Sequence, residues 1–468
     1  MTTLRAHPFY DRPLLRRLQA PALVFVLAFA VFAGFAGPRI KQASPHIHFT
    51  YLAESFLSGT VEMTDPPPHD NDWSTYIELT LASGQTISGI WWDRGARKFV
   101  DLKGRLYIID AHDLRGSREN KRTFVSFPPM PAVLMMPGVA VWGRAFNDVL
   151  FTVAFAALNA ALLYVLLRRV ILGGLTRLHP GDAGWLTALF TVGTAHLWCG
   201  VQGGVWFTAL IVGATFTIAY MLCAIDARRP FWAGLWLACA FATRTPVLFS
   251  VVFFAAFFFF PGGQWRRDWG RRFWRDGLAF ASVPLVVGCL LMAMNYVRYE
   301  SLSEFGHKYL AAGQIDRIKH YGLFNVHWLS RNLTALLALV PKFLPDPPWF
   351  QISKHGLAIW VSTPAVLYLA MQRRLTSATD ALWRRATTVT TFVIAVPHLF
   401  YQNTGWVQFS YRFAIDYFPY LTLLLALGRA RATTMFKLAI VVGVAINVFG
   451  AVTFDRAGKY YGEWMLED

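Results

Sequence analysis

Four side chains able to accept a proton follow the first long apolar run of the chain. His46 and His48 lie two residues apart, Glu54 lies six residues beyond His48, and Asp72 directly precedes Trp73. An imidazole titrates near neutral pH, and a positioned carboxylate can take the proton of a hydroxyl group. These four residues are therefore our candidate catalytic residues.

Each of these four residues also has a simpler explanation. Glu54 can lie on the solvated face of a helix, Asp72 can cap a turn, and the two histidines can serve in packing. The spacing of His46 and His48 is compatible with a metal ion, but no acidic residue follows at ligand spacing. We therefore expect neither a metal site nor a bound cofactor.

A second set of candidate residues is basic and lies much later in the chain. Arg244 and Arg412 border long apolar runs, where a charge without a partner is costly. His307 and Lys308 lie in a polar segment between such runs. Cationic side chains neutralise the negative charge of a phosphate group, so we assign all four residues to phosphate binding.

The alternatives for the basic residues are structural. Arg244 can extend along an apolar helix to reach water, and Arg412 can pair with Asp416 one helical turn later. His307 and Lys308 can be ordinary exposed polar residues. The two arginines need an anionic partner in any case, and either a phosphate group or Asp416 would provide it.

The composition indicates that these residues lie among apolar helices. The chain has 468 residues, of which 55% are hydrophobic and only 15% are charged, whereas about 25% of the residues in a typical soluble domain are charged. Apolar runs of about 17–25 residues recur, as in helices that cross a bilayer. The net charge is +17, and arginines gather in the short connections between these runs. That placement indicates membrane topology rather than nucleic-acid binding.

We therefore predict an all-α polytopic membrane protein with about eleven transmembrane helices. The arginines within residues 1–20 place the N-terminus in the cytoplasm, and the first span is retained because no clear cleavage site follows it. Alternation then places the C-terminus outside. The expected spans are residues 21–37, 148–167, 184–198, 204–223, 231–243, 246–261, 277–294, 356–371, 387–402, 413–428 and 435–454.

The polar segments outside the spans complete the predicted organisation. In the first outer loop, residues 76–80, 86–90 and 105–109 are expected to form strands of a small β-rich insert. Residues 130–143 are apolar but short and contain two prolines, so we expect an interfacial helix that lies flat on the outer surface. The predicted regions are 1–37 with the first span, 38–147 as the outer loop, 148–294 with spans two to seven, 295–355 as a second outer segment, and 356–468 with the last four spans.

A run rich in phenylalanine covers residues 253–260. Low-complexity aromatic sequence of this kind in an apolar helix is typical of a surface that faces lipid. The alternative is a groove for a lipid chain. We therefore expect these rings to lie on the outside of the helical part of the protein.

The order of these features, together with three short motifs, resembles the GT-C superfamily of membrane glycosyltransferases. The superfamily includes aminoarabinose transferases, protein-mannosyl transferases and uncharacterised bacterial relatives. Its members share a first span, a long outer loop, an interfacial helix opened by Pro-Pro and a later outer segment. The resemblance covers most of residues 20–260. The motifs are Leu52-Ala-Glu-Ser-Phe-Leu-Ser-Gly59, Phe127-Pro-Pro-Met-Pro-Ala-Val-Leu134 followed by Trp142-Gly143, and Ala233-Gly-Leu235 leading to Ala242-Thr-Arg244.

The resemblance implies an enzyme of the plasma membrane, the inner membrane of a bacterial cell envelope, with its active face toward the periplasm. Such an enzyme moves a sugar from a polyprenyl-phosphate donor to a lipid or glycan acceptor and contacts membrane lipids. Members of the superfamily typically carry an acidic residue soon after the first span. In this chain the corresponding position falls near Pro45 and His46, where there is no carboxylate. Two alternatives follow: a transporter or flippase of lipid-linked sugar, and a GT-C-like scaffold that binds glycolipid without catalysis.

Overall fold

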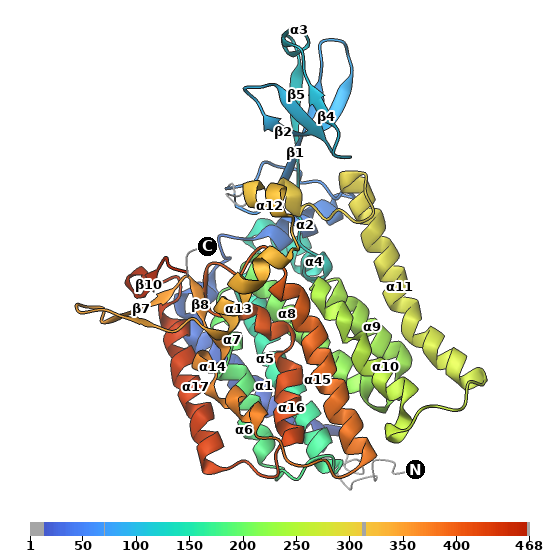
Figure 1. Ribbon diagram of the computed structural model, residues 1–468, viewed down its shortest axis with the longest axis vertical. Helices are drawn as coiled ribbons and strands as arrows, with labels where there is room; N and C mark the ends of the chain where they lie inside the picture. The colour runs from blue at the N-terminus through green and yellow to red at the C-terminus, as the bar shows by residue number, and fades with distance from the viewer. Residues whose placement is uncertain (1–13, 70, 311–314, 466–468) are drawn as a thin grey trace. The chain divides into compact units, whose positions relative to one another are not determined.

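The chain forms two units, one mainly helical and one containing a five-stranded sheet. Arg5 and Arg12, which contribute to the predicted cytoplasmic N-terminus, lie outside the described residues. The computed structural model (Figure 1) describes residues 14–69, 71–310 and 315–465. The helical unit comprises the described residues up to His46, Asn147–Leu285 and those from Phe324 onward, and the sheet unit comprises Ile47–Phe146 and those of Val286–Leu323.

Five helices among the described residues are long and apolar enough to cross a membrane. These helices indicate a membrane protein, as predicted, whereas the eleven spans and their orientation stay predictions. Labelled in Figure 1, the five are α1 (Leu14–Ala36), α5 (Asp148–Leu172), α8 (Val205–Ala224), α11 (Arg271–Tyr299) and α17 (Thr434–Thr453).

Most of the other expected spans form shorter helical pieces, whereas the span expected at 387–402 falls mostly in a helix of 22 residues. A new helix begins within the span expected at 184–198, because the side chain of Thr194 accepts a hydrogen bond from the backbone N–H of His196. Pro364 likewise begins a separate 3-10 helix within the span expected at 356–371. These helices are α6 (Asp182–Val192), α7 (Ala195–Gly200), α9 (Pro230–Phe241), η5 (Thr245–Ser250), α10 (Val251–Phe259), α14 (Ile359–Ser362), η9 (Pro364–Ala370), α15 (Ala378–Leu399), η10 (Arg412–Asp416) and α16 (Phe418–Gly428).

Helix α5 packs against both α1 and α8 in the helical unit (Figure 1). It begins at the cap residue Asn147, whose side chain accepts a hydrogen bond from the backbone N–H of Leu150. Ala156, Ala157 and Ala160 in α5 are buried, and such small side chains let apolar helices approach closely. The interior is thus packed, and a polar side chain within it needs a partner.

Four of the six phenylalanines in the run lie in this interior rather than toward lipid, whereas Phe260 is 40% exposed. Phe253, Phe254, Phe257 and Phe258 in α10 are each at most 5% exposed. The ring of Phe253 lies 5.4 Å from that of Tyr420 in α16, and α10 packs against α15. The prediction of a lipid-facing surface is therefore wrong for these four rings.

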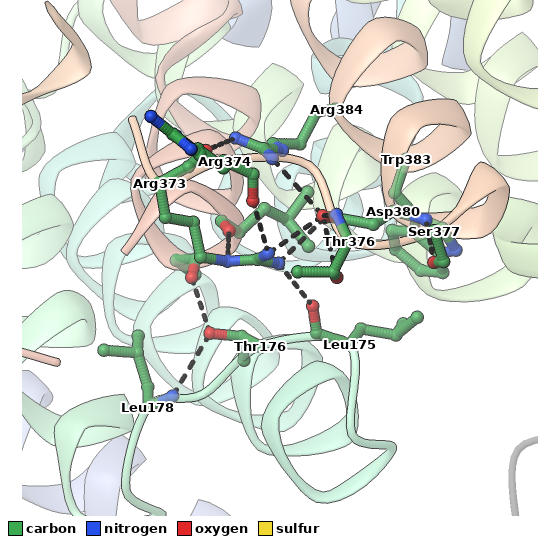
Figure 2. A network of polar contacts seen from close by, with 12 residues as sticks. Leu175, Thr176, Leu178, Arg373, Arg374, Thr376, Ser377, Asp380, Trp383 and Arg384 are labelled. Atoms are coloured by element: carbon green, nitrogen blue, oxygen red, sulfur yellow. Dashed lines mark hydrogen bonds and ion pairs between the residues drawn. The ribbon is translucent and has the colours of Figure 1, made fainter. Parts of the chain in front are cut away.

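A polar cluster joins the start of α15 to the end of α16 (Figure 2). Asp380 accepts hydrogen bonds from both terminal nitrogens of Arg373, each at 2.8 Å, and from the backbone N–H of Thr376 at 3.0 Å. Arg373 also donates to the carbonyl of Leu427, while Arg384 donates to the carbonyl of Arg373. Because charged groups form these bonds, the cluster fixes the connection between the helices at this end.

The sheet unit contains an antiparallel sheet in the order β4-β3-β2-β1-β5. The strands expected at 76–80, 86–90 and 105–109 correspond to β1, β2 and β4, so this part of the prediction is confirmed. Sequence alternation missed β5 because nearly all of its residues are polar; hydrogen bonds to β1 hold it in place, with Tyr76 opposite Arg122. The strands are β1 (Ser74–Thr80), β2 (Thr86–Asp93), β3 (Lys98–Asp101), β4 (Leu106–Ile108) and β5 (Arg118–Phe124).

Helix α4 (Met130–Trp142) of the sheet unit corresponds to the predicted interfacial segment. Its 13 residues span about 20 Å at 1.5 Å per residue, too short for a hydrocarbon core of about 30 Å. It packs against α2 (His48–Leu57), and its flat orientation stays a prediction. The smaller elements include α3 (Ala111–Leu114), η7 (His307–Tyr309), α12 (Ile315–Tyr321), α13 (Leu329–Leu337), β6 (Lys342–Phe343), β7 (Phe350–Ser353), β8 (His355–Leu357), β9 (Gln408–Ser410) and β10 (Tyr461–Gly462).

Candidate functional site

A buried carboxylate in the helical unit, that of Asp416, lies between a guanidinium and an imidazole. Nε of Arg244 donates to both carboxylate oxygens at 3.1 Å, and Nη2 donates to Oδ2 at 2.7 Å. Nε2 of His398 lies 3.1 Å from Oδ2. The side chain of Asp416 is 0% exposed and that of Arg244 is 18% exposed, so the guanidinium is the part of this cluster nearest to solvent.

Three separate elements bring these residues together. Arg244 precedes η5, His398 lies in the last turn of α15, and Asp416 ends the short helix η10. Gly213 in α8 leaves room for the Arg244 side chain, because a Cβ at this glycine would lie 2.7 Å from Cγ of Arg244. The cluster therefore depends on close packing between α8 and the turn that carries Arg244.

The ring of Phe413 is shared by several of these side chains. The guanidinium carbons of Arg244 and Arg412 lie 5.6 Å and 5.8 Å from its centroid. The imidazole of His398 stacks on it at 5.0 Å with an angle of 16° between the planes. Two of the four predicted phosphate-binding residues are thus brought to one ring, next to the carboxylate of Asp416.

Arg412 is held by the chain that precedes it. Its backbone N–H donates to Oε1 of Gln408 at 2.9 Å, and the amide nitrogen of Gln408 donates to the carbonyls of His355 and Thr404. Its guanidinium carbon also lies 5.2 Å from the ring of Phe207 in α8. Only 5% of Arg412 is exposed, so its charge is placed in the interior by packing on aromatic rings.

The alternatives proposed for the two arginines do not describe this geometry. Arg244 is bound to a buried carboxylate, rather than extended alone toward water. Arg412 and Asp416 are the two ends of a 3-10 helix, in which residues three apart, not four, lie on the same face. The carboxylate of Asp416 instead accepts a hydrogen bond from Arg244, which is distant in the sequence, and lies next to the imidazole of His398.

This arrangement combines two chemical capacities. A carboxylate that faces an imidazole holds the ring in one orientation and tautomer, which prepares it to take a proton. Guanidinium groups bind phosphate through several N–H donors in a fixed plane. Arg244, Arg412 and Asp416 together carry a net charge of +1.

Glu54, a predicted catalytic residue in α2 of the sheet unit, is part of an ion-pair cluster. Nε of Arg144 donates to its Oε2 at 2.9 Å, Arg144 also binds Asp65, and the guanidinium carbon lies 4.6 Å from the ring of Tyr51. The hydrogen bonds with Asp65 and Glu54 raise the pKa of Arg144 above its usual range. Glu54 is thus held by a permanent cation.

The two predicted histidines of the first loop fall in different units. His46 belongs to the helical unit and packs on Trp206 with ring centroids 4.6 Å apart. His48 begins α2 of the sheet unit, is fully buried, and stacks on Trp73 at 3.8 Å. Asp72 has φ of +59° in the turn before β1. These surroundings match packing and turn roles. No group of three metal-ligating side chains occurs in the described part of the chain.

The remaining predicted residues also belong to the sheet unit. Nζ of Lys308 lies 2.9 Å from Oε2 of Glu304, and the ring of His307 lies edge-on to Phe127 and Phe305. A single site built from these residues, the first loop and the two arginines therefore stays a prediction, since its members are divided between the units.

Sequence reasoning missed His398 and treated Asp416 only as a local partner. A signal was available, because both fall within expected membrane spans, where ionisable residues are rare and often functional. Tyr411 is a further polar residue beside them: its ring lies edge-on to Phe413 at 6.0 Å, and its buried hydroxyl has no hydrogen-bond partner among the described residues. Comparisons of the chain with family models, with curated proteins and with solved structures found no match.

Proposed function

We propose that this protein is a GT-C-type membrane glycosyltransferase that moves a sugar from a polyprenyl-phosphate donor to a lipid or glycan acceptor. The observation that carries the proposal is the cluster around Phe413, where Arg244 and Arg412 lie beside the pair of Asp416 and His398. The guanidinium groups suit a phosphate-linked donor, and the carboxylate–imidazole pair suits proton transfer. Sugar transfer needs both in one place.

In the proposed reaction, the acceptor hydroxyl gives its proton to His398 while its oxygen forms a bond to the anomeric carbon of the donor sugar. The bond from that carbon to the phosphate oxygen breaks, and polyprenyl phosphate leaves with the bonding electrons. Arg244 and Arg412 stabilise the charge on the leaving phosphate. Asp416 keeps the imidazole oriented. We place the base at His398 rather than at Glu54, because Glu54 is bound to a guanidinium.

Replacing Arg244 or Arg412 with alanine is expected to weaken binding of a polyprenyl-phosphate sugar about 10- to 150-fold, since a charge-assisted contact contributes about 1.5–3 kcal/mol. Binding is measured by titration of the full chain in lipid nanodiscs. Arg429→Ala is the matched control. Arg429 is 9% exposed and its guanidinium carbon lies 4.6 Å and 4.5 Å from the rings of Tyr368 and Phe436, so it resembles Arg412 without belonging to the cluster.

Each outcome of this titration has a distinct meaning. Donor binding that is unchanged in both Arg244→Ala and Arg412→Ala would remove these arginines from the site. A wild-type protein that binds the donor through them but transfers no sugar to any acceptor would be a glycolipid-binding scaffold rather than an enzyme. Loss of binding in Arg429→Ala as well would point to general damage to the helical unit.

The proposed orientation can be tested by cysteine labelling. With a cytoplasmic N-terminus, eleven spans and the active face outside, Met465→Cys is expected to react with a membrane-impermeant thiol reagent from outside, and Asp268→Cys is not. The experiment needs a background without the native cysteines, since Cys289 is exposed. Labelling at position 268 from outside would overturn the orientation.

A further inference from the structure

A cavity of about 410 Å³ lies within the sheet unit, among the end of α2, the loop after it, β5 and α11. Pockets for small ligands have volumes of about 300–1,000 Å³. Its lining includes the rings of Phe56 and Phe124 and the charged side chains of Glu62 and Arg122. It contains no residue of the proposed catalytic cluster, so its role has to be argued separately.

The two charged residues that line the cavity, Glu62 and Arg122, form a fixed network with Glu78, which does not line the cavity but binds the same guanidinium. Nε of Arg122 lies 2.6 Å from Oε2 of Glu62, and Nη1 lies 2.6 Å from Oε1 of Glu78 on the neighbouring strand. Burial lowers the pKa of Arg122, but the hydrogen bond and charge of Glu62 outweigh it and raise the pKa overall. The guanidinium therefore stays charged. Glu62 and Arg122, which line the cavity, balance each other, and Glu78 on the other side of the ion pair brings the formal charge of the network to −1.

The aromatic part of the cavity adds no charge. The guanidinium carbon of Arg122 lies 5.9 Å from the ring of Phe124, and Tyr76 stacks on the same ring at 5.6 Å. Burial raises the pKa of Tyr76 to about 12, so its hydroxyl stays protonated at neutral pH. An anionic ligand would meet a single guanidinium that two carboxylates already bind, in a network of formal charge −1, whereas a neutral ligand would find an apolar face beside a donor–acceptor pair.

We propose that this cavity binds a small carbohydrate without phosphate groups. The faces of a sugar ring are apolar and its edge carries hydroxyls, which matches phenyl rings beside a carboxylate and a guanidinium. The carboxylate of Glu62 accepts a hydrogen bond from one hydroxyl while Arg122 donates to its neighbour. Assigning this sugar to the acceptor rests on the proposed function; it then names the acceptor as a glycan rather than a phosphate-bearing lipid.

The test uses the full chain in detergent micelles, with no polyprenyl-phosphate donor present. Glucose and glucose 6-phosphate are the probes, because they share one ring and differ in charge, and binding is followed by saturation-transfer NMR and titration. Glucose is expected to bind, and glucose 6-phosphate is expected to bind at least about tenfold more weakly. Glu62→Gln removes one negative charge and should reduce the difference in affinity between glucose and glucose 6-phosphate.

A second variant locates the site. Val297 lines the cavity from α11 and is 68% exposed, so Val297→Trp should fill the cavity without disturbing the fold. Glucose binding is expected to fall about tenfold or more in this variant. Leu290→Trp is the control, because Leu290 lies on the same helix, is 63% exposed, and does not line the cavity.

The outcomes separate this inference from the proposed function. Equal glucose binding by Val297→Trp and the wild type would overturn the cavity as the site, and tighter binding of glucose 6-phosphate would overturn the charge argument. Failure of glucose to bind the wild type would also overturn the proposal. Donor binding through Arg244 and Arg412 is measured independently, so it can succeed or fail whatever this experiment shows.

Discussion

Replacing His398 with glutamine is expected to lower the rate of sugar transfer about 10²–10⁴-fold, the usual contribution of a general base, while donor binding changes little. Nε2 of His398 lies 3.1 Å from the carboxylate of Asp416, so the proposed reaction uses Nδ1 as the nitrogen that takes the proton. Glutamine keeps a polar side chain of similar length but cannot act as a base near neutral pH. The measurements are the single-turnover rate of transfer and the dissociation constant of the donor.

His196→Gln is the matched control for this prediction. His196 is 0% exposed and His398 is 4% exposed, so both are buried, but Nε2 of His196 lies 3.0 Å from the side-chain amide of Asn159 instead of a carboxylate. Loss of packing alone would affect both variants alike. Transfer at the wild-type rate in His398→Gln would show that His398 is not the base, and an equal loss in the two variants would attribute the effect to packing.

The parts of the fold that were predictable from the sequence depend on local patterns. Long apolar runs gave α1, α5, α8, α11 and α17, because a helix that crosses a bilayer needs about 20 apolar residues in succession. The alternation of apolar and polar residues predicted β1 and β2. The same reasoning placed the phenylalanine run of α10 toward lipid, since composition shows that a helix is apolar but not which neighbours cover it.

The candidate site was only partly predictable because its contacts join distant segments. Charge in apolar surroundings singled out Arg244 and Arg412, whose guanidinium carbons lie 5.6 Å and 5.8 Å from the centroid of the Phe413 ring. Local spacing, however, predicted that Asp416 pairs with Arg412, four residues away. Its observed partner Arg244 is 172 residues distant. Likewise Glu54 binds Arg144, 90 residues further along the chain. Tertiary packing decides such pairs, and periodicity contains no information about them.

Replacing Asp416 alone with leucine is expected to lower the free energy of unfolding by about 3–5 kcal/mol, because it leaves the guanidinium of Arg244 without its buried carboxylate. The two residues are 0% and 18% exposed, so water screens the remaining charge poorly. Changing both residues together, Arg244→Met with Asp416→Leu, is expected to recover most of this loss, since apolar side chains of similar volume leave no buried charge. Denaturant titration in detergent micelles measures both variants.

The double variant separates the structural role of the pair from its functional role. With its stability recovered, it should still bind the polyprenyl-phosphate donor at least about tenfold more weakly than the wild type, because the guanidinium that we propose to hold the phosphate is gone. It should also fail to orient His398 for transfer. A double variant that is both stable and fully active would assign Arg244 and Asp416 to folding alone. One that remains as unstable as Asp416→Leu would contradict the argument that the unpaired arginine causes the loss.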